Sequence, residues 1–187
     1  MLKLIARAIM KLRGWTSFNA EVGVEKAVII AAPHTSNWDA FWGIVFIVAN
    51  DIRVQFFGKH TLFWFPLGAI LRYFGCVPLN RAQAGSAVAQ AVRLFADRDA
   101  LLFAMAPEGT RSYRPHWKSG FYRIARGASV PVLVGVIDYA KKQIGFAACL
   151  DLTGDEAADL QRIASLYEGA AGFHPEKMGP IRLKKPE

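Results

Sequence analysis

The stretch Val28-Ile29-Ile30-Ala31-Ala32-Pro33-His34-Thr35-Ser36-Asn37-Trp38-Asp39 decides the expected fold of this chain. Its first five residues are apolar and rich in β-branched side chains, as is typical of a strand buried on both faces, and Pro33 ends that strand. Ser36 is a good N-cap with an acidic residue three positions later, so a helix is predicted from about Asn37 to Ala49. The pattern therefore places His34 at the end of a strand and Asp39 in the first turn of a helix.

His34 and Asp39 form a candidate catalytic pair. The dipole and the free backbone N–H groups of a helix's first turn favour an ionised carboxylate, which could accept a hydrogen bond from one imidazole nitrogen of His34. The other nitrogen would then be free to take a proton. The alternative is that Asp39 only completes a capping box with Ser36 and that His34 is an ordinary loop histidine.

Strands and helices alternate on the C-terminal side of this stretch. Strands are predicted at residues 53–57, 75–79, 100–105, 130–137 and 143–150, the last as an edge strand. Helices are predicted from Ser86, from about Trp117, and over residues 153–169 with a capping box of Thr153 and Glu156. The alternation predicts a single-domain α/β fold with a mostly parallel or mixed sheet and helices on both faces. Ligands gather at the carboxyl ends of strands in such sheets, where His34, Lys59, Arg81 and residues 108–111 are expected.

The two ends of the chain are predicted to lie outside this domain, which is assigned to residues 15–172. Residues 1–14 are expected to form an amphipathic helix, with basic side chains four residues apart on one face (Lys3, Arg7 and Lys11) and apolar side chains on another (Leu2, Ile5, Ile9 and Leu12). Such a helix suits an anionic bilayer surface, and docking on its own domain is the alternative. Residues 173–187 are expected to be an extended or frayed tail.

Composition limits the classes of partner. The 187 residues, 53% of them apolar, suit one domain with a sizeable core, and Lys and Arg exceed Asp and Glu to give a net charge of +8. The charge suggests an anionic partner: a phosphate-bearing small molecule, an acidic carrier protein, nucleic acid or a lipid surface. The longest apolar run, residues 40–49, is about half the length of a bilayer-spanning helix, and no cleavable signal is evident. The protein is expected in the cytosol or on a membrane.

Cysteine and histidine spacing gives little support for a disulfide or a metal site. Cys76 and Cys149 lie in strand-like surroundings without CxxC spacing, so both are expected to be reduced, buried thiols. No HExxH or comparable ligand spacing is present, although a metal-dependent hydrolase could use His34, Asp39, His60 and His116. Nucleic-acid binding is suggested by charge alone, since no recognisable motif accompanies it. Neither a metal nor a nucleic acid is expected.

Four separated blocks of sequence agree with one known family in order and spacing. They are His34-x4-Asp39; Lys59 with Pro66, Gly68, Gly75 and Arg81; Pro107-Glu108-Gly109-Thr110-Arg111-Ser112; and Val130-Pro131-Val132-Leu133. The third block is the most specific of the four. With these blocks, which span roughly residues 28 to 137, the chain resembles the lysophosphatidic acid acyltransferase family of glycerolipid acyltransferases.

The resemblance implies transfer of a fatty acyl group from a thioester, on coenzyme A or acyl carrier protein, to a hydroxyl of a lysophospholipid-like acceptor. His34 would be the general base and Asp39 would orient its ring, so that no nucleophile of the enzyme and no cofactor beyond the acyl donor is required. Lys59, or backbone N–H groups nearby, would stabilise the oxyanion of the tetrahedral intermediate.

The same resemblance assigns the acceptor side of the site. Arg81 and Arg111 would bind an acceptor phosphate, while Glu108 would orient the acceptor's hydroxyls or brace one of the arginines. Gly109 would allow a tight loop beside the ligand, and Thr110 would cap that loop. The flanks depart from the family at five positions (Pro33, His60, Asn80, Ala106 and Gly135), which leaves the acceptor open.

The expected location is the cytoplasmic face of a membrane, bound peripherally through the N-terminal helix. The aromatic segment Leu62–Phe74 would help to admit an acyl chain. A catalytically silent module that binds lipid or an acyl carrier is the alternative function, because such a module would keep the basic surface and the apolar groove.

Overall fold

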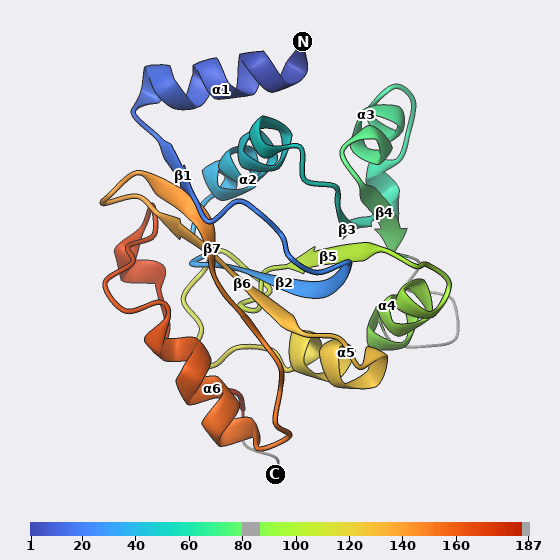
Figure 1. Ribbon diagram of the computed structural model, residues 1–187, viewed down its shortest axis with the longest axis vertical. Coiled ribbons are helices and arrows are strands. Elements are labelled where there is room, and N and C mark those ends of the chain that lie inside the picture. The colour runs from blue at the N-terminus through green and yellow to red at the C-terminus, as the bar shows by residue number, and fades with distance from the viewer. Residues whose placement is uncertain (80–86, 185–187) are drawn as a thin grey trace.

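One mixed sheet forms the centre of the computed structural model, which describes residues 1–79 and 87–184. Within these residues, seven strands follow the order β1-β7-β6-β2-β5-β3-β4 (Figure 1). They are β1 Thr16–Phe18, β2 Lys26–Ala32, β3 Val54–Lys59, β4 Cys76–Leu79, β5 Leu101–Met105, β6 Val132–Asp138 and β7 Gln143–Leu150. Neighbouring strands are parallel except β6 and β7, which pair antiparallel. The predicted α/β fold with a mixed sheet is confirmed.

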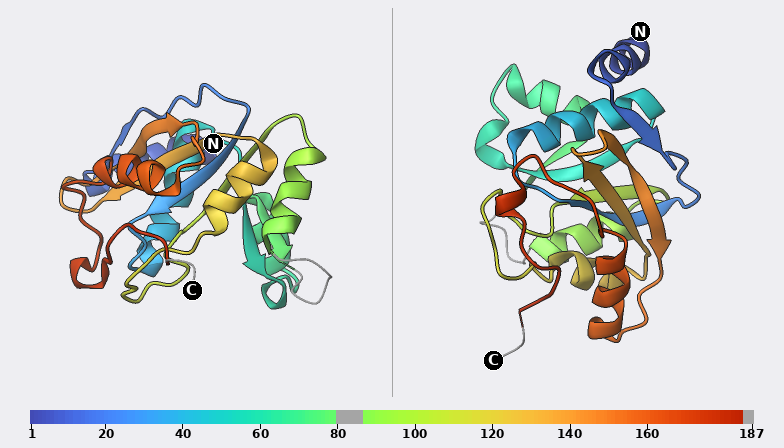
Figure 2. Two further views of the ribbon diagram at one scale, coloured as in Figure 1. Left: turned by 90° about the horizontal axis from the view of Figure 1, so that it is seen from below. Right: turned by 90° about the vertical axis from the view of Figure 1, so that its left-hand side faces the viewer.

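Helices cover both faces of this sheet. On one side lie α1 Leu2–Arg13, α2 Asn37–Asn50 and α3 Leu67–Tyr73; on the other lie α4 Ala87–Ala96, α5 Gly120–Ala128 and α6 Glu156–Ser165 (Figures 1 and 2). Two short 3-10 helices are present as well, η1 His60–Leu62 after β3 and η2 Pro175–Lys177 near the C-terminal end.

The central strand β2 is buried on both faces, as its composition predicts. Side chains alternate along a strand, so Val28 and Ile30 pack toward α4, α5 and α6, whereas Ala27 and Ile29 pack toward α1 and α2. Val28 and Ile30 have no exposed surface at all, and each such side chain contributes about 1.5–3 kcal/mol of hydrophobic stabilisation. His34 thus lies just beyond the carboxyl end of a deeply buried central strand.

Two sequence expectations about β7 are wrong. Residues 143–150 are not an edge strand, because β1 pairs with β7 on the side away from β6. β1 lies in residues 14–26, for which the sequence allows either a loop or a short strand. Cys149, which lies on β7, is exposed rather than buried, whereas Cys76 is buried as expected.

The last helix differs from its prediction at both ends. α6 begins at Glu156 with Asp155 as its N-cap and ends at Ser165. The predicted capping box of Thr153 and Glu156 is wrong, because the Thr153 hydroxyl donates to Asp159 at 3.0 Å instead. Asp159, six residues after Thr153, accepts the bonds from the Thr153 hydroxyl and N–H groups, so neither is available to a capping box.

The N-terminal helix α1 packs on its own domain and still exposes apolar side chains. Ala6 and Met10 are buried in the core layer that includes α2. Arg7 Nε donates to the Ala49 carbonyl at 2.9 Å, and Lys3 Nζ lies 3.4 Å from Asp51, so two of the four basic residues of α1 point toward the end of α2. The exposed side is mainly apolar, with Leu2, Leu4, Ile5 and Leu12 between 46 and 83% exposed. No helix among residues 1–79 and 87–184 is long and apolar enough to cross a bilayer.

Residues 170–183, here called the C-terminal strap, run back across the carboxyl ends of the strands. The strap contacts β6 where the Tyr139 N–H donates to the Ala171 carbonyl at 2.8 Å. Its other end pairs with Trp117, whose N–H donates to the Arg182 carbonyl at 2.7 Å. Of the two expectations for the tail after Phe173, fraying is wrong for its described part, which is held in place by these bonds. Because Trp117 pairs with the strap, α5 begins at Gly120 rather than near Trp117.

Candidate active site

The structure brings the side chains of His34 and Asp39 together. His34 follows Pro33 at the carboxyl end of β2, and Asp39 occupies the third position of α2. His34 Nδ1 lies 3.2 Å from Asp39 Oδ2, with the carboxylate side chain 1% exposed and the imidazole 22% exposed. In the part of the chain that the structure describes, no hydrogen bond engages Nε2 of His34. One ring nitrogen is therefore held and the other is available.

Asp39 also completes the capping box with Ser36, so the two interpretations of this residue are compatible. The Thr35 and Ser36 N–H groups donate to Oδ2 at 2.7 and 2.8 Å, and the Tyr139 hydroxyl donates to Oδ1 at 2.8 Å. Burial alone would raise the pKa of Asp39, but the bonds from His34, Ser36 and Tyr139 outweigh it and hold the pKa below its ordinary value. The carboxylate is ionised and its direction is fixed on both oxygens.

Glu108 lies behind the backbone of His34. The His34 N–H donates to Glu108 Oε1 at 2.9 Å, while Oε2 is buried and has no partner among the described residues. Burial raises the pKa of Glu108 above its ordinary value, although the bond from His34 acts against this. A cavity of about 30 Å³ lies between Glu108, Tyr167 and strap residues 178–181, which is room for about one water molecule. Glu108 thus braces His34 rather than Arg111, with which no ion pair is formed.

The loop after β5 carries the remaining candidates of the third block. Gly109 has a left-handed backbone with φ 65°, and a Cβ there would lie within 3 Å of the Lys118 side chain. The glycine therefore lets Lys118 lie across the loop. Thr110 is half-buried and accepts a hydrogen bond from the Ser112 N–H at 3.4 Å, whereas Arg111 is exposed.

Lys59, like His34, lies at the carboxyl end of a parallel strand, but the two residues are not in contact. It is the last residue of β3, which is separated from β2 by β5. Two strand spacings put the strand axes about 10 Å apart. Lys59 is exposed, and so is its neighbour His60. Arg81 and Asn80 lie outside the described residues.

Tyr139 and Lys118 are site residues that sequence reasoning missed. Tyr139 is 100 residues from Asp39 and belongs to none of the four blocks. One signal was available: Tyr139 directly follows β6, and side chains at that end of a parallel strand tend to reach the ligand site. Lys118 gave no such signal, because only the backbone turn at Gly109 brings its side chain to the loop.

The described residues hold no cluster of three His, Cys, Asp or Glu side chains suited to a metal ion. His116 lies in the loop after β5, whereas His60 begins the 3-10 helix η1 after β3. The arrangement at His34 and Asp39 is chemically that of a general base with an orienting carboxylate.

Comparisons with known proteins agree with this geometry. A family model described as Acyltransferase matches residues 12–137, about two thirds of the chain. Among solved structures, the chain is similar to the 1-acyl-sn-glycerophosphate (LPA) acyltransferase PlsC from Thermotoga maritima, with a TM-score of 0.60 and 19% identity over 89% of this chain and 77% of that one. At this identity the likeness shows the fold. No curated protein is similar enough to count as a match. The family expected from the four sequence blocks is confirmed: the chain belongs to the Acyltransferase family and is an acyltransferase enzyme.

Proposed function

We propose that the protein transfers a fatty acyl group from a thioester, on coenzyme A or acyl carrier protein, to a hydroxyl of a lysophospholipid acceptor. The observation that carries the proposal is the 3.2 Å contact between His34 Nδ1 and a buried Asp39, which leaves the other ring nitrogen unengaged in the described structure. The similar fold of PlsC, described as an LPA acyltransferase, supports a lysophospholipid as the acceptor class.

The reaction needs a base because a hydroxyl is a poor nucleophile at neutral pH. His34 Nε2 removes the proton as the acceptor oxygen attacks the thioester carbonyl carbon, which contributes roughly two to four orders of magnitude in rate. Asp39 holds the ring in the required tautomer and stabilises the imidazolium. The tetrahedral intermediate then expels the thiolate, and the imidazolium returns its proton to that sulfur. No covalent bond to the enzyme forms.

Basic side chains near the carboxyl ends of the strands would bind the anionic groups of both substrates. Lys59 is the candidate for the oxyanion, provided that its flexible side chain reaches toward β2 from the end of β3. Arg111 and Lys118 lie on the loop after β5 and would bind an acceptor phosphate, together with Arg81. Glu108, Gly109 and Thr110 shape that loop.

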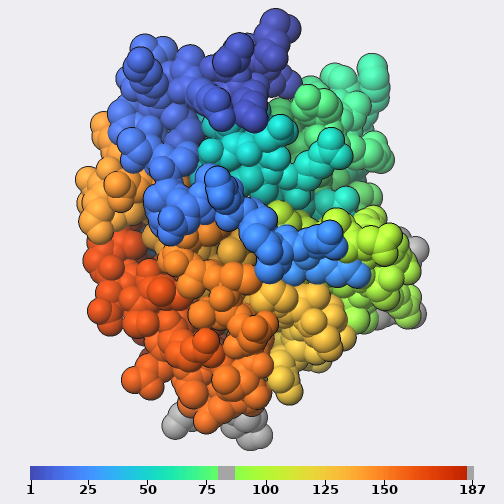
Figure 3. All heavy atoms as spheres, viewed as in Figure 1, coloured from blue at the N-terminus to red at the C-terminus, as the bar shows by residue number. Residues whose placement is uncertain are grey.

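The surface suits peripheral binding at the cytoplasmic face of a membrane. Apolar side chains are exposed on α1 and on the segments that follow β2 and β3, with Trp38 52%, Trp64 60% and Phe65 88% exposed. Figure 3 shows α1 on the surface above α2. Aromatic side chains settle at lipid interfaces, and a net charge of +8 attracts anionic headgroups. Binding to anionic vesicles that weakens with salt and in W64A/F65A would support this location; equal binding to neutral vesicles would contradict the electrostatic part.

One experiment tests the activity itself. Purified protein is offered acyl-coenzyme A and acyl carrier protein donors, with lysophosphatidic acid, other lysophospholipids and a phosphate-free monoacylglycerol as acceptors, and products are read by mass. We expect transfer to phosphate-bearing acceptors and a loss of at least about 10³-fold in H34A, whose folding is checked by circular dichroism. Absence of transfer by the wild type with every donor would favour a silent lipid- or carrier-binding module.

A further inference from the structure

Tyr139 is the only described side chain that donates a hydrogen bond to Oδ1 of Asp39. Its hydroxyl lies 2.8 Å from that oxygen, whereas the bonds from Thr35 and Ser36 go to Oδ2, the oxygen that faces His34. Tyr139 lies beyond residues 12–137, the part of the chain that the family model matches. The family comparison therefore assigns it no role.

Two separate parts of the chain hold Tyr139. Trp15, just before β1, meets it edge-on with ring centroids 5.1 Å apart, and Phe173 of the C-terminal strap meets it at 5.2 Å. The Tyr139 N–H donates to Ala171 of the same strap. The strap also contacts the residue that follows His34, because the His174 N–H donates to Thr35 Oγ1 at 3.1 Å. Packing therefore fixes the direction in which the hydroxyl points.

The hydroxyl keeps its proton throughout the neutral range. Burial and the bond to Asp39 raise the pKa of Tyr139 above its ordinary value. Without this donor, Oδ1 would be a buried carboxylate oxygen with no partner among the described groups, which is costly. The carboxylate could then turn, and more of its negative charge would act on His34.

We propose that Tyr139 is a positioning residue for acyl transfer, which orients the Asp39 carboxylate so that Oδ2 meets His34 Nδ1 in the geometry that the general base requires. The inference rests on the proposed function of His34. It extends the site from the matched region into the C-terminal third of the chain, because the strap that anchors Tyr139 also contacts Thr35.

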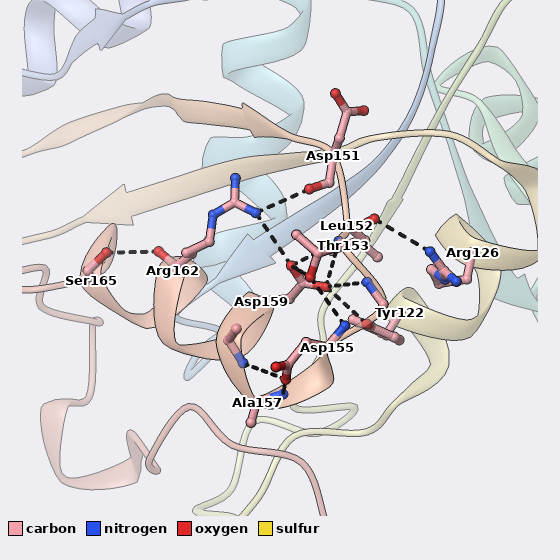
Figure 4. Close-up of polar contacts among 12 residues, drawn as sticks. Tyr122, Arg126, Asp151, Leu152, Thr153, Asp155, Ala157, Asp159, Arg162 and Ser165 are labelled. Atoms are coloured by element: carbon pink, nitrogen blue, oxygen red, sulfur yellow. Dashed lines mark hydrogen bonds and ion pairs between the residues drawn. The ribbon is translucent and has the colours of Figure 1, made fainter.

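The test is Y139F, which removes the hydroxyl and keeps the ring. Y122F is a matched control, since the Tyr122 hydroxyl donates at 3.0 Å to Asp159, a second buried carboxylate at the opposite end of the sheet (Figure 4). We expect Y139F to lower kcat about tenfold with the acceptor KM changed less than about twofold, and Y122F to leave both unchanged.

A second readout does not depend on turnover. The titration of the His34 ring is followed by NMR, and its midpoint should move by about half a pH unit or more in Y139F, because the direction and charge of the Asp39 carboxylate set how strongly it attracts the imidazolium. Y122F should not move it. The other titratable groups around Asp39 are Glu108, on the backbone of His34, and His174, on Thr35; neither is changed by the substitution.

The outcomes separate this inference from the proposed function. When Y139F is added to D39N, kcat should fall by less than about twofold further, because Tyr139 acts through Asp39. An unchanged His34 titration in a folded Y139F, or losses in Y139F and D39N that simply multiply, would overturn the role of Tyr139 while leaving acyl transfer intact. Full activity of H34A would instead overturn the proposed mechanism, whatever Y139F does to the titration.

Discussion

Two buried aspartates at opposite ends of the sheet are held in closely similar ways. Asp39 lies in the first turn of α2 and Asp159 in the first turns of α6, and both are at most 2% exposed. Each accepts two backbone N–H groups from the preceding loop and one tyrosine hydroxyl, from Tyr139 and Tyr122. Figure 4 shows the Asp159 set. In each case, hydrogen bonds outweigh burial and lower the pKa of the carboxyl below its ordinary value.

The two sites differ in the basic side chain that completes them. At Asp159 it is Arg162, whose Nη1 lies 3.4 Å away and which stays charged at every physiological pH. At Asp39 it is His34, which can gain and lose a proton. The shared framework of loop N–H groups and a tyrosine makes a rigid, ionised carboxylate. The partner differs in what it allows: Arg162 only joins β7 to α6 through Asp159, whereas His34 serves proton transfer in the mechanism that we propose.

The largest expected effect is on transfer in D39N. The substitution keeps the shape but removes the charge that orients and stabilises the His34 ring, so we expect kcat to fall about 10³–10⁴-fold. D159N is the matched control and should retain most of the activity at a temperature where it is folded. The measurement is product formation with the best donor and acceptor pair. Comparable losses of kcat in D39N and D159N would contradict the proposed functional difference between the two aspartates.

The next effect is on stability in D159N. An amide there cannot accept all the bonds from Thr153, Gly154 and Tyr122, and its own N–H₂ would be buried near donors. We expect the free energy of unfolding to fall by about 2–4 kcal/mol. Urea unfolding followed by circular dichroism measures it, with wild type and Y122F alongside. A loss below about 1 kcal/mol would show that the loop before α6 relaxes to satisfy the amide.

Stability should also depend on pH through both carboxylates. Each has a lower pKa in the folded state than its ordinary 3.8, so each contributes stability above that value and loses it as the pH falls through the folded pKa. Every unit of depression contributes about 1.4 kcal/mol. Urea unfolding between about pH 6 and pH 3 should give a flat region and then a decline, which is shallower in D159N and in D39N. An acid decline that neither substitution alters would place its origin elsewhere.

The smallest effect is expected for R162Q. The Arg162 side chain is 46% exposed, so its pairing with Asp159 is weakened by water and contributes less than about 1 kcal/mol. Unfolding of R162Q at low and high salt checks this, since the small difference from wild type should vanish at high salt. The contrast with H34A sharpens the comparison: the basic partner is nearly dispensable at one aspartate and essential for turnover at the other.

The sequence predicted those parts of the molecule that depend on local patterns. The apolar run of β2, Pro33 and the Ser36 N-cap together specify a strand, a turn and a helix, and these alone bring His34 within reach of Asp39. Alternating strands and helices specify the layers. The resemblance to a family identified the loop after β5 as part of the site.

What the sequence did not predict depends on contacts between distant residues. The sequence left residues 14–26 open as a loop or a short strand, and the pairing of Thr16–Phe18 with β7 decides for the strand. The strap has no periodicity of its own and is held by backbone bonds to Trp117 and Tyr139. Tyr139 reaches Asp39 across 100 residues, and no spacing rule spans that distance.

The strap has a consequence for the newly made chain. Thr35 and His174, which it joins, are 139 residues apart. At a synthesis rate of roughly 5–20 residues per second, the ribosome needs about 7–28 s to reach the second after the first. For most of that interval β2 and α2 can already have emerged, but Tyr139 and the strap that packs against its ring have not been synthesised. The contacts that fix Asp39 are therefore complete only after the strap has been synthesised.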